Sequence, residues 1–167
     1  MEAPLYSADP TALAVTAKNW LKGMVAGFIA TVVLSVLMLI KQRMGLVPQL
    51  DPIEMLTKMA GASTPALGWV PHFLIGTVVW GSLFPIFDAR VPAGSHWLNG
   101  ILFGIGAWIL MMVLVMPMAG AGLFGMALGI MVPIATLVLY LIYGAVLGGT
   151  YGLEHPDPLP QFQVTHR

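Results

Sequence analysis

Residues 91–153 read VPAGSHWLNGILFGIGAWILMMVLVMPMAGAGLFGMALGIMVPIATLVLYLIYGAVLGGTYGL and carry no Lys, Arg, Asp or Glu. A helix needs about 20 apolar residues to cross the hydrocarbon core of a membrane, so this run is long enough for two crossings. Two shorter uncharged runs, 23–40 and 59–87, hold one crossing each. The sequence therefore predicts an all-α membrane protein with four transmembrane helices.

The composition of the 167 residues is typical of a chain immersed in a lipid bilayer. Hydrophobic residues make up 58% of the chain and charged residues 8%, whereas a soluble domain carries roughly a quarter charged residues on its wetted surface. The net charge is zero and no basic stripe occurs, which argues against binding to nucleic acid. Because the chain has no cysteine, disulfides and thiolate metal sites are excluded.

Charges and prolines set the expected boundaries. We expect a membrane domain over 20–152 with four spans, at about 20–43, 66–87, 97–117 and 126–151. A polar, amphipathic segment precedes it over 1–19, with a helix starting near Asp9-Pro10, because Asp caps helices and Pro suits their first turn. Pro133 is expected either to kink the fourth span or to mark its true start. A mobile, proline-containing tail is expected over 153–167.

The loop before the second span contains the pattern of a short helix. Asp51-Pro52-Ile53-Glu54 has the form of a capping box. Ile53, Leu56 and Met59 then recur at a spacing of three, which places them near one another on a helix. The sequence predicts an interfacial helix near 52–60 that lies on the membrane.

The first and third spans are similar in sequence. Residues 20–39, WLKGMVAGFIATVVLSVLML, and 97–116, WLNGILFGIGAWILMMVLVM, are identical at seven of twenty positions, and a weaker match joins the second and fourth spans. A unit with two crossings ends on the side where it began. A duplication therefore predicts two helical hairpins in parallel orientation, with both chain ends on one side of the membrane. The alternative is chance matching among glycine and apolar residues.

Glycines recur at four-residue spacing in three of the spans. The pairs are Gly23 and Gly27, Gly100 and Gly104, and Gly144 and Gly148. Small residues at this spacing let helix backbones approach closely in lipid. We expect these glycines to be helix-packing positions, either between helices of one chain or between subunits.

Histidines and methionines are the candidate metal ligands. His96 and His155 flank the third and fourth spans on the side of the chain ends, where one hypothesis is an oxygen and nitrogen metal site. Met112 and Met116 form Met-x-x-x-Met, a thioether pair of the kind that binds copper(I). Solvated loop residues and flexible core packing are the favoured interpretations, so no cofactor is expected.

Two features are candidates for a working site without metal. His72 is expected near the start of the second span, in a hydrogen bond with a neighbouring helix or with interfacial water. The uncharged linker MAGAGLFG, residues 118–125, can lie at the interface or dip inward, and its candidate residues are Gly120, Gly122 and Gly125. The hydroxyls within the spans can bond to their own helix, at Thr31, Ser35, Thr77, Ser82 and Thr136.

No enzyme is predicted. The sequence has no nucleotide-binding loop and no Gly-x-Ser-x-Gly or His-Glu-x-x-His motif. No carboxylate lies inside a predicted span, which also counts against a proton-coupled transporter. The first hypothesis is a non-enzymatic accessory or scaffold subunit of a larger membrane complex, or a homo-oligomer. The second is a small channel or carrier for an uncharged or weakly polar solute, and the third is a metal or haem handling protein.

Four segments together resemble an uncharacterised family of short bacterial inner-membrane proteins, a domain of unknown function. The segments are VAGFIATVVLSVLML, HFLIGTVVWG, FGIGAWILMMVLVMPMAGAGLFG and LIYGAVLGGTYG, and the likeness covers about residues 22–152. The resemblance implies a four-span form in the bacterial inner membrane and transfers no catalytic residue.

Lys and Arg near the spans are equal in number on the two sides of the membrane, so the positive-inside rule does not choose an orientation. The linker over 118–125 carries no charge and crosses the membrane most easily. We therefore expect the two chain ends to be cytoplasmic.

Overall fold

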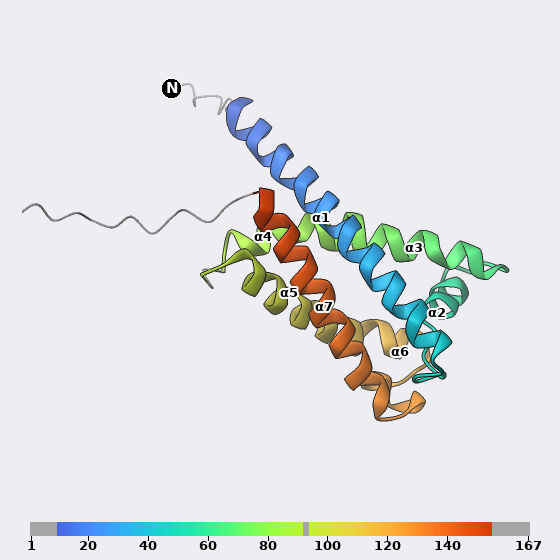
Figure 1. Ribbon diagram of the computed structural model, residues 1–167. Helices are drawn as coiled ribbons and strands as arrows, with labels where there is room; N and C mark the ends of the chain where they lie inside the picture. Colours follow the sequence, from blue (N-terminus) through green and yellow to red (C-terminus); the bar gives the residue numbers. More distant parts are fainter. Residues whose placement is uncertain (1–9, 92–93, 155–167) are drawn as a thin grey trace, which may run out of the picture.

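The computed structural model describes residues 10–91 and 94–154. Within these residues the chain forms helices and no strand, and four stretches are long and apolar enough to cross a membrane (Figure 1). We call them spans 1 to 4, and they are Asn19–Arg43, Pro65–Asp88, His96–Met118 and Met131–Leu153. The prediction of an all-α membrane protein with four helices is confirmed.

The spans differ in regularity. Span 1 lies within one long helix, α1 (Pro10–Arg43), which begins at the proline expected to start it. Span 2 has four consecutive helical pieces, η1 (Pro65–Gly68), α3 (Trp69–Phe73), η2 (Leu74–Trp80) and α4 (Gly81–Asp88). Span 3 has three, α5 (His96–Leu110), η3 (Met111–Val115) and α6 (Met116–Met118). Both η2 and η3 are π-helical, with hydrogen bonds between residues five apart.

Span 4 lies within α7 (Met131–Glu154) and starts later than the predicted residue 126. The residues before it form η4 (Leu123–Leu128), where Phe124 and Gly125 have φ angles of 57° and 68°. Gly129 follows with a φ of 108°. An α-helix cannot continue through backbone with positive φ, so the start of span 4 is corrected to Met131, and Pro133 lies in its first turn.

The short helix expected near 52–60 is present as α2 (Pro52–Met59). The Asp51 carboxylate accepts hydrogen bonds from the backbone N–H groups of Ile53 and Glu54, each at 3.0 Å, which satisfies two amides that a helix start leaves unpaired. Ile53 and Thr57 are buried. This face packs against η1, where a Cβ on Gly68 would overlap the Ile53 carbonyl and the Thr57 hydroxyl. Part of the α2 surface is thus directed at the protein.

The spans form two hairpins that pack side by side. Span 1 contacts span 2 and α7, span 3 contacts α7, and α4 contacts α5, which gives the order 2–1–4–3 around the bundle. In Figure 1 the first turns of α1 and the last turn of α7 lie at one end of the bundle, and α2, α6 and η4 lie at the other. We call these ends the terminal side and the loop side.

Two buried clusters join the hairpins. The cluster toward the terminal side contains aromatic and aliphatic side chains, Ala26, Ala30, Phe84, Phe103, Tyr143, Leu147 and Tyr151. The cluster at the loop side contains Leu50, Met112, Met116, Ala121 and Val132. Leu50 comes from the loop of the first hairpin and is buried among residues of the second. The first loop therefore helps to hold the two hairpins together.

Close contacts between glycines hold the helices of each hairpin together. An added Cβ on Gly23 would overlap the Gly81 carbonyl, and one on Gly104 would overlap the Tyr140 carbonyl. An added Cβ on Gly100, Gly144 or Gly148 would likewise overlap a backbone carbonyl of the opposite helix. Small residues allow this approach. All six glycines of the predicted pairs thus contact a neighbouring helix of the same chain, including Gly27, described next.

The π-helical segment η2 explains how two glycines five residues apart face the same helix. A Cβ on Gly27 would lie 2.8 Å from the Gly76 carbonyl oxygen and 2.8 Å from the Gly81 Cα. In an α-helix, positions five apart point about 140° away from each other. The i to i+5 bonding of a π segment brings them back to nearly the same face. Gly76 and Gly81 can therefore both pack on α1.

Candidate functional site

A cavity of about 130 Å³ lies between the four spans, in the half of the bundle toward the loop side. Each span contributes to its wall, and so does α2. Apolar cavities of about 150 Å³ in proteins can take up a molecule as large as benzene. The cavity is thus large enough for a small ring or for part of a hydrocarbon chain.

Methionine and leucine are the most frequent residues in the wall of the cavity, and the methionines come from several helices. Five methionines line it, from α1, α2, η3 and α6, and they are Met38, Met55, Met59, Met111 and Met116. Methionine side chains are unbranched and polarizable, so they adapt to guests of different shapes. Leucine, isoleucine and valine side chains make up much of the remaining wall. Such a wall suits an apolar ligand and does not require one rigid shape.

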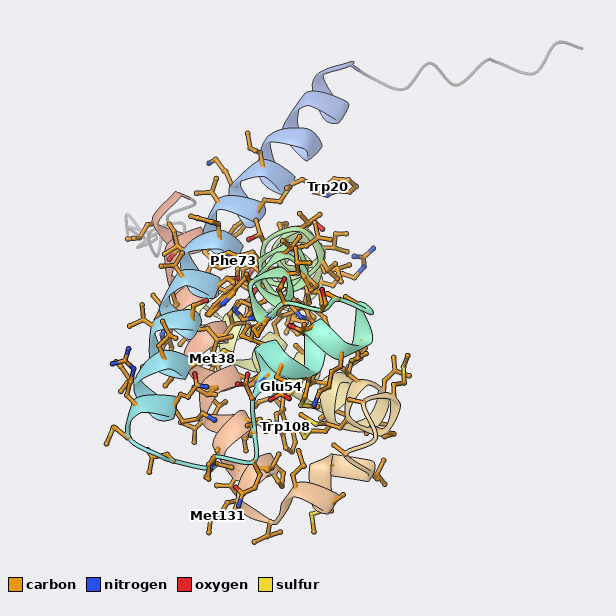
Figure 2. The ribbon with its side chains drawn as sticks, turned by 90° about the vertical axis from the view of Figure 1, so that its right-hand side faces the viewer. Trp20, Met38, Glu54, Phe73, Trp108 and Met131 are labelled. Carbon is orange, nitrogen blue, oxygen red and sulfur yellow. The ribbon has the colours of Figure 1, made fainter. Side chains whose placement is uncertain are left out.

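We infer that the cavity opens between spans 2 and 3, which contact each other mainly through α4 and α5, toward the terminal side. Ile75 of span 2 and Leu110 of span 3 both line it, and they are 36% and 46% exposed. Both residues lie well inside their spans, so this opening faces the hydrocarbon of the bilayer. At the loop side, α2 covers the cavity with Met55, Leu56 and Met59, and Figure 2 shows α2, which carries Glu54, between α3 and α6.

Both π-helical segments border the cavity. η2 contributes Ile75, Gly76 and Trp80, and η3 contributes Met111 and Val115. π segments within α-helices occur frequently at functional sites. Their position on either side of this opening supports the cavity as the candidate site.

His72 lines the cavity and is tied to span 1. Its Nε2 lies 3.0 Å from Ser35 Oγ, so the expected bond to a neighbouring helix is present. Ser35 Oγ itself donates to the Thr31 carbonyl at 2.7 Å. A serine hydroxyl has one proton. Because that proton is directed at Thr31, we assign the proton of the neutral His72 ring to Nε2, which leaves a lone pair on Nδ1. His72 Nδ1 has no hydrogen-bond partner within residues 10–91 and 94–154.

Two tyrosines of α7 also line the cavity. The Tyr143 hydroxyl donates to the Gly76 carbonyl of η2 at 2.7 Å, which links span 4 to span 2. The Tyr140 hydroxyl has no hydrogen-bond partner in the described part of the chain. Sequence reasoning missed both residues. Their position in the middle of a predicted span could have indicated a role. Tyrosine in a span is normally found at the membrane interfaces, and a buried hydroxyl needs a partner.

The hydroxyls within the spans mostly bond to their own helices, as expected. Thr31 donates to the Gly27 carbonyl, Ser82 to Val78, and Thr136 to Val132. Thr136 also accepts a hydrogen bond of 3.1 Å from the Trp108 indole N–H. Thr77 differs, because its buried hydroxyl has no partner among the described residues. Thr31 and Thr136 line the cavity, and their protons are already directed at backbone carbonyls.

A second polar group lies at the terminal side. His96 Nδ1 is 2.8 Å from Asp88 Oδ2, and the Asn99 amide donates to Asp88 Oδ1 at 2.8 Å. These bonds join span 2 to span 3. His155, the other candidate ligand of the predicted metal site, lies outside the described residues. Over 10–91 and 94–154, no three His, Asp or Glu side chains are grouped so that they could hold a metal ion.

The two methionines of Met-x-x-x-Met lie in the protein interior. Met112 and Met116 are both fully buried in the loop-side cluster. The Met112 sulfur is 3.9 Å from the Thr136 hydroxyl, and Met116 also reaches the cavity. Their surroundings match the interpretation of flexible core packing.

The linker over 118–125 folds back onto the bundle. Ala121 is buried in the loop-side cluster, and Gly125 is buried next to Val132, where an added Cβ would lie 2.9 Å from a Val132 methyl. Gly120 and Gly122 are at turns with positive φ. Gly120 also borders a groove of about 420 Å³ between the linker and α2. The linker thus dips inward at Ala121 and does not line the cavity.

No curated protein and no solved structure matches the chain. A family model described as a family of unknown function (DUF6789) matches residues 17–161. The matched range includes the four spans, α2 and every residue that lines the cavity. The chain therefore belongs to the DUF6789 family, a family of unknown function.

Proposed function

We propose that this protein is an integral membrane protein that binds a small, lipid-soluble, weakly polar molecule in the cavity. The observation that carries this proposal is the cavity itself, which is lined by methionine, opens on the bilayer and is bordered by two π segments. Ligand sites are typically apolar cavities with a small number of placed polar groups. The function is that of a carrier or receptor for the molecule.

Binding without chemical change fits the polar groups better than catalysis does. A Ser and His pair can form a nucleophile, but there the imidazole accepts the serine proton. Here the shorter hydrogen bond of Ser35 sends its proton to the Thr31 carbonyl. No carboxylate lines the cavity in the described part of the chain to orient His72. We therefore favour a non-enzymatic role.

Two other hypotheses receive less support. They are an accessory or scaffold subunit of a larger complex, and a homo-oligomer. The predicted glycine pairs were the sequence features that suited contacts between subunits, and their contacts lie within one chain. The exposed apolar side chains on the spans suit lipid as well as a partner helix. A metal or haem role ranks last, because the described residues contain no group of three suitable ligands.

We propose the bacterial inner membrane as the location, with the chain ends in the cytoplasm. The support is the resemblance found in the sequence and the lack of charge in residues 118–125, which makes this linker the easiest to move across the membrane. A cytoplasmic reporter enzyme fused after Arg167 is expected to be active. If only a reporter that works in the periplasm were active, the proposed orientation would be wrong and the chain ends would be periplasmic.

Photolabelling in vesicles tests the binding function. The probe is a decane that carries a diazirine, incorporated into phosphatidylcholine vesicles with the purified protein. We expect saturable labelling of cavity residues such as Met55 and Met111, located by mass spectrometry. Val115→Phe replaces a small side chain of the cavity wall with an aromatic ring that fills part of the cavity. It should reduce this labelling at least tenfold, because a filled cavity excludes a guest.

Val113→Phe is the matched control. Val113 lies on the same π segment as Val115 but is 47% exposed and does not line the cavity. It should leave the saturable labelling unchanged. The proposal fails when cavity labelling does not saturate, or when both variants label as the unmodified chain does.

A further inference from the structure

We propose that the ligand is an alcohol or a phenol, and that its hydroxyl is recognised by Tyr140 and His72. The inference rests on the proposed binding function and specifies the chemistry of the ligand. Two polar atoms at the cavity carry it. They are the Tyr140 hydroxyl and the Nδ1 of His72, neither of which has a hydrogen-bond partner among the residues described.

These two groups lie on the same side of a hydrogen bond that joins spans 4 and 2. The hydrogen bond between Tyr143 and Gly76 fixes spans 4 and 2 relative to each other. From Gly76, His72 is four residues toward the loop side, a distance of about 6 Å along a helix. From Tyr143, Tyr140 is three residues toward the loop side, or about 4.5 Å. Both steps run in the same direction, so Tyr140 and His72 lie on the loop side of this hydrogen bond and line the cavity from two spans.

The two groups are complementary to one hydroxyl. Tyr140 can donate its proton, and Nδ1 of the neutral His72 ring can only accept one. A ligand hydroxyl accepts from the first and donates to the second. A carbonyl can use the tyrosine alone, and a hydrocarbon can use neither. Because a polar group in an apolar site costs free energy until it is paired, the cavity should prefer the hydroxyl.

The remaining wall accommodates the apolar body of such a molecule. Met111, Val115 and Leu110 lead from the cavity toward the opening between spans 2 and 3. An alkyl chain or ring that projects through this opening enters the hydrocarbon of the bilayer. The structure therefore suits a ligand with one polar end inside the protein and an apolar end that can extend into lipid.

Competition against the diazirine decane tests the inference. The competitors are decan-1-ol, decane and decan-2-one, each added to the same vesicles. Decanol should displace the probe at a concentration about tenfold lower than decane, as expected for one to two additional hydrogen bonds in an apolar site. Decanone should displace the probe at an intermediate concentration.

Tyr140→Phe should bring the displacing concentration of decanol to within about twofold of that of decane. It should leave displacement by decane unchanged, which also shows that the variant is folded.

Tyr151→Phe is the control, because Tyr151 is on the same helix but lies in the cluster toward the terminal side and does not line the cavity. This variant should retain the preference for decanol. Equal displacement by decanol and decane, in the unmodified chain, would overturn the inference and leave the binding function standing. Equal displacement by decanone and decanol would remove the role of His72. Labelling that does not saturate would instead contradict the binding function itself.

Discussion

Single glycines determine how closely the helices of each hairpin approach. Gly100 of span 3 faces Gly144 and Gly148 of span 4 so closely that a Cβ on Gly100 would lie 2.8 Å from the Gly148 Cα. Gly106, six residues later in the same helix, has no atom within 4 Å of the position of its Cβ. The two glycines share a helix and a residue type, but only the first is required by packing.

Gly100→Ala is expected to destabilise the protein by about 1–3 kcal/mol, because a methyl group forced against backbone separates spans 3 and 4. Gly106→Ala is the control and should be neutral or stabilising by up to about 1 kcal/mol, since alanine favours helix more than glycine does. Unfolding in mixed detergent micelles with increasing sodium dodecyl sulfate measures both. Similar losses for the two variants would refute the internal glycine contact.

Individual polar residues of the site could be predicted only in part. His72 and the hydroxyls of the spans stand out because polar side chains in an apolar run need an explanation. Tyr140 and Tyr143 do not, because tyrosine also counts toward an apolar composition. The cavity itself could not be predicted, because it is a space left between side chains of the four spans, α2 and the first loop.

At the scale of elements, α2 was predictable and its packing was not. The Asp51 cap and the spacing of apolar residues indicate a helix from local sequence alone. Which surface an amphipathic helix covers depends on the distant residues that it meets, here η1 and the cavity. The π segments could not be predicted either, because they differ from α-helix in hydrogen-bond register and have no distinctive composition.

Asp51→Ala should loosen α2, since it removes both hydrogen bonds that cap the helix. The expected loss is about 0.5–2 kcal/mol of local stability. Hydrogen exchange of the backbone amides in 52–60, followed by mass spectrometry, should become faster. Glu54→Ala is the control, because the exposed pair of Glu54 and Lys58 contributes only about 0.3–0.5 kcal/mol. Unchanged exchange in the Asp51 variant would count against the cap.

In the whole molecule, the four spans place the loop of the first hairpin and the turn between the two hairpins on opposite sides of the membrane. Hydropathy predicts this alternation because each helix must cross the bilayer on its own. The order 2–1–4–3 around the bundle could not be predicted in this way. It depends on which helix faces fit together, such as the glycine contacts between spans 3 and 4.

The lack of cysteine makes this arrangement testable without background labelling. Ser63→Cys and Ala89→Cys each introduce one thiol at an exposed position, between spans 1 and 2 and between spans 2 and 3. With a membrane-impermeant maleimide, we expect Ser63→Cys to react in right-side-out vesicles and Ala89→Cys in inverted vesicles. Reaction of both thiols from one side would contradict the four-span topology.

The π segment η2 also affects how the two hairpins are aligned with each other. Gly27 of span 1 packs on Gly76 and Gly81 of span 2, whereas Gly104, which aligns with Gly27, packs on Tyr140 and Gly144 of span 4. Span 2 therefore has one more residue between these points, and an ungapped alignment loses register after Gly76. If the hairpins share an ancestor, one copy gained or lost a residue there, beside the cavity, and the two halves of the protein diverged at the place where the ligand is expected to bind.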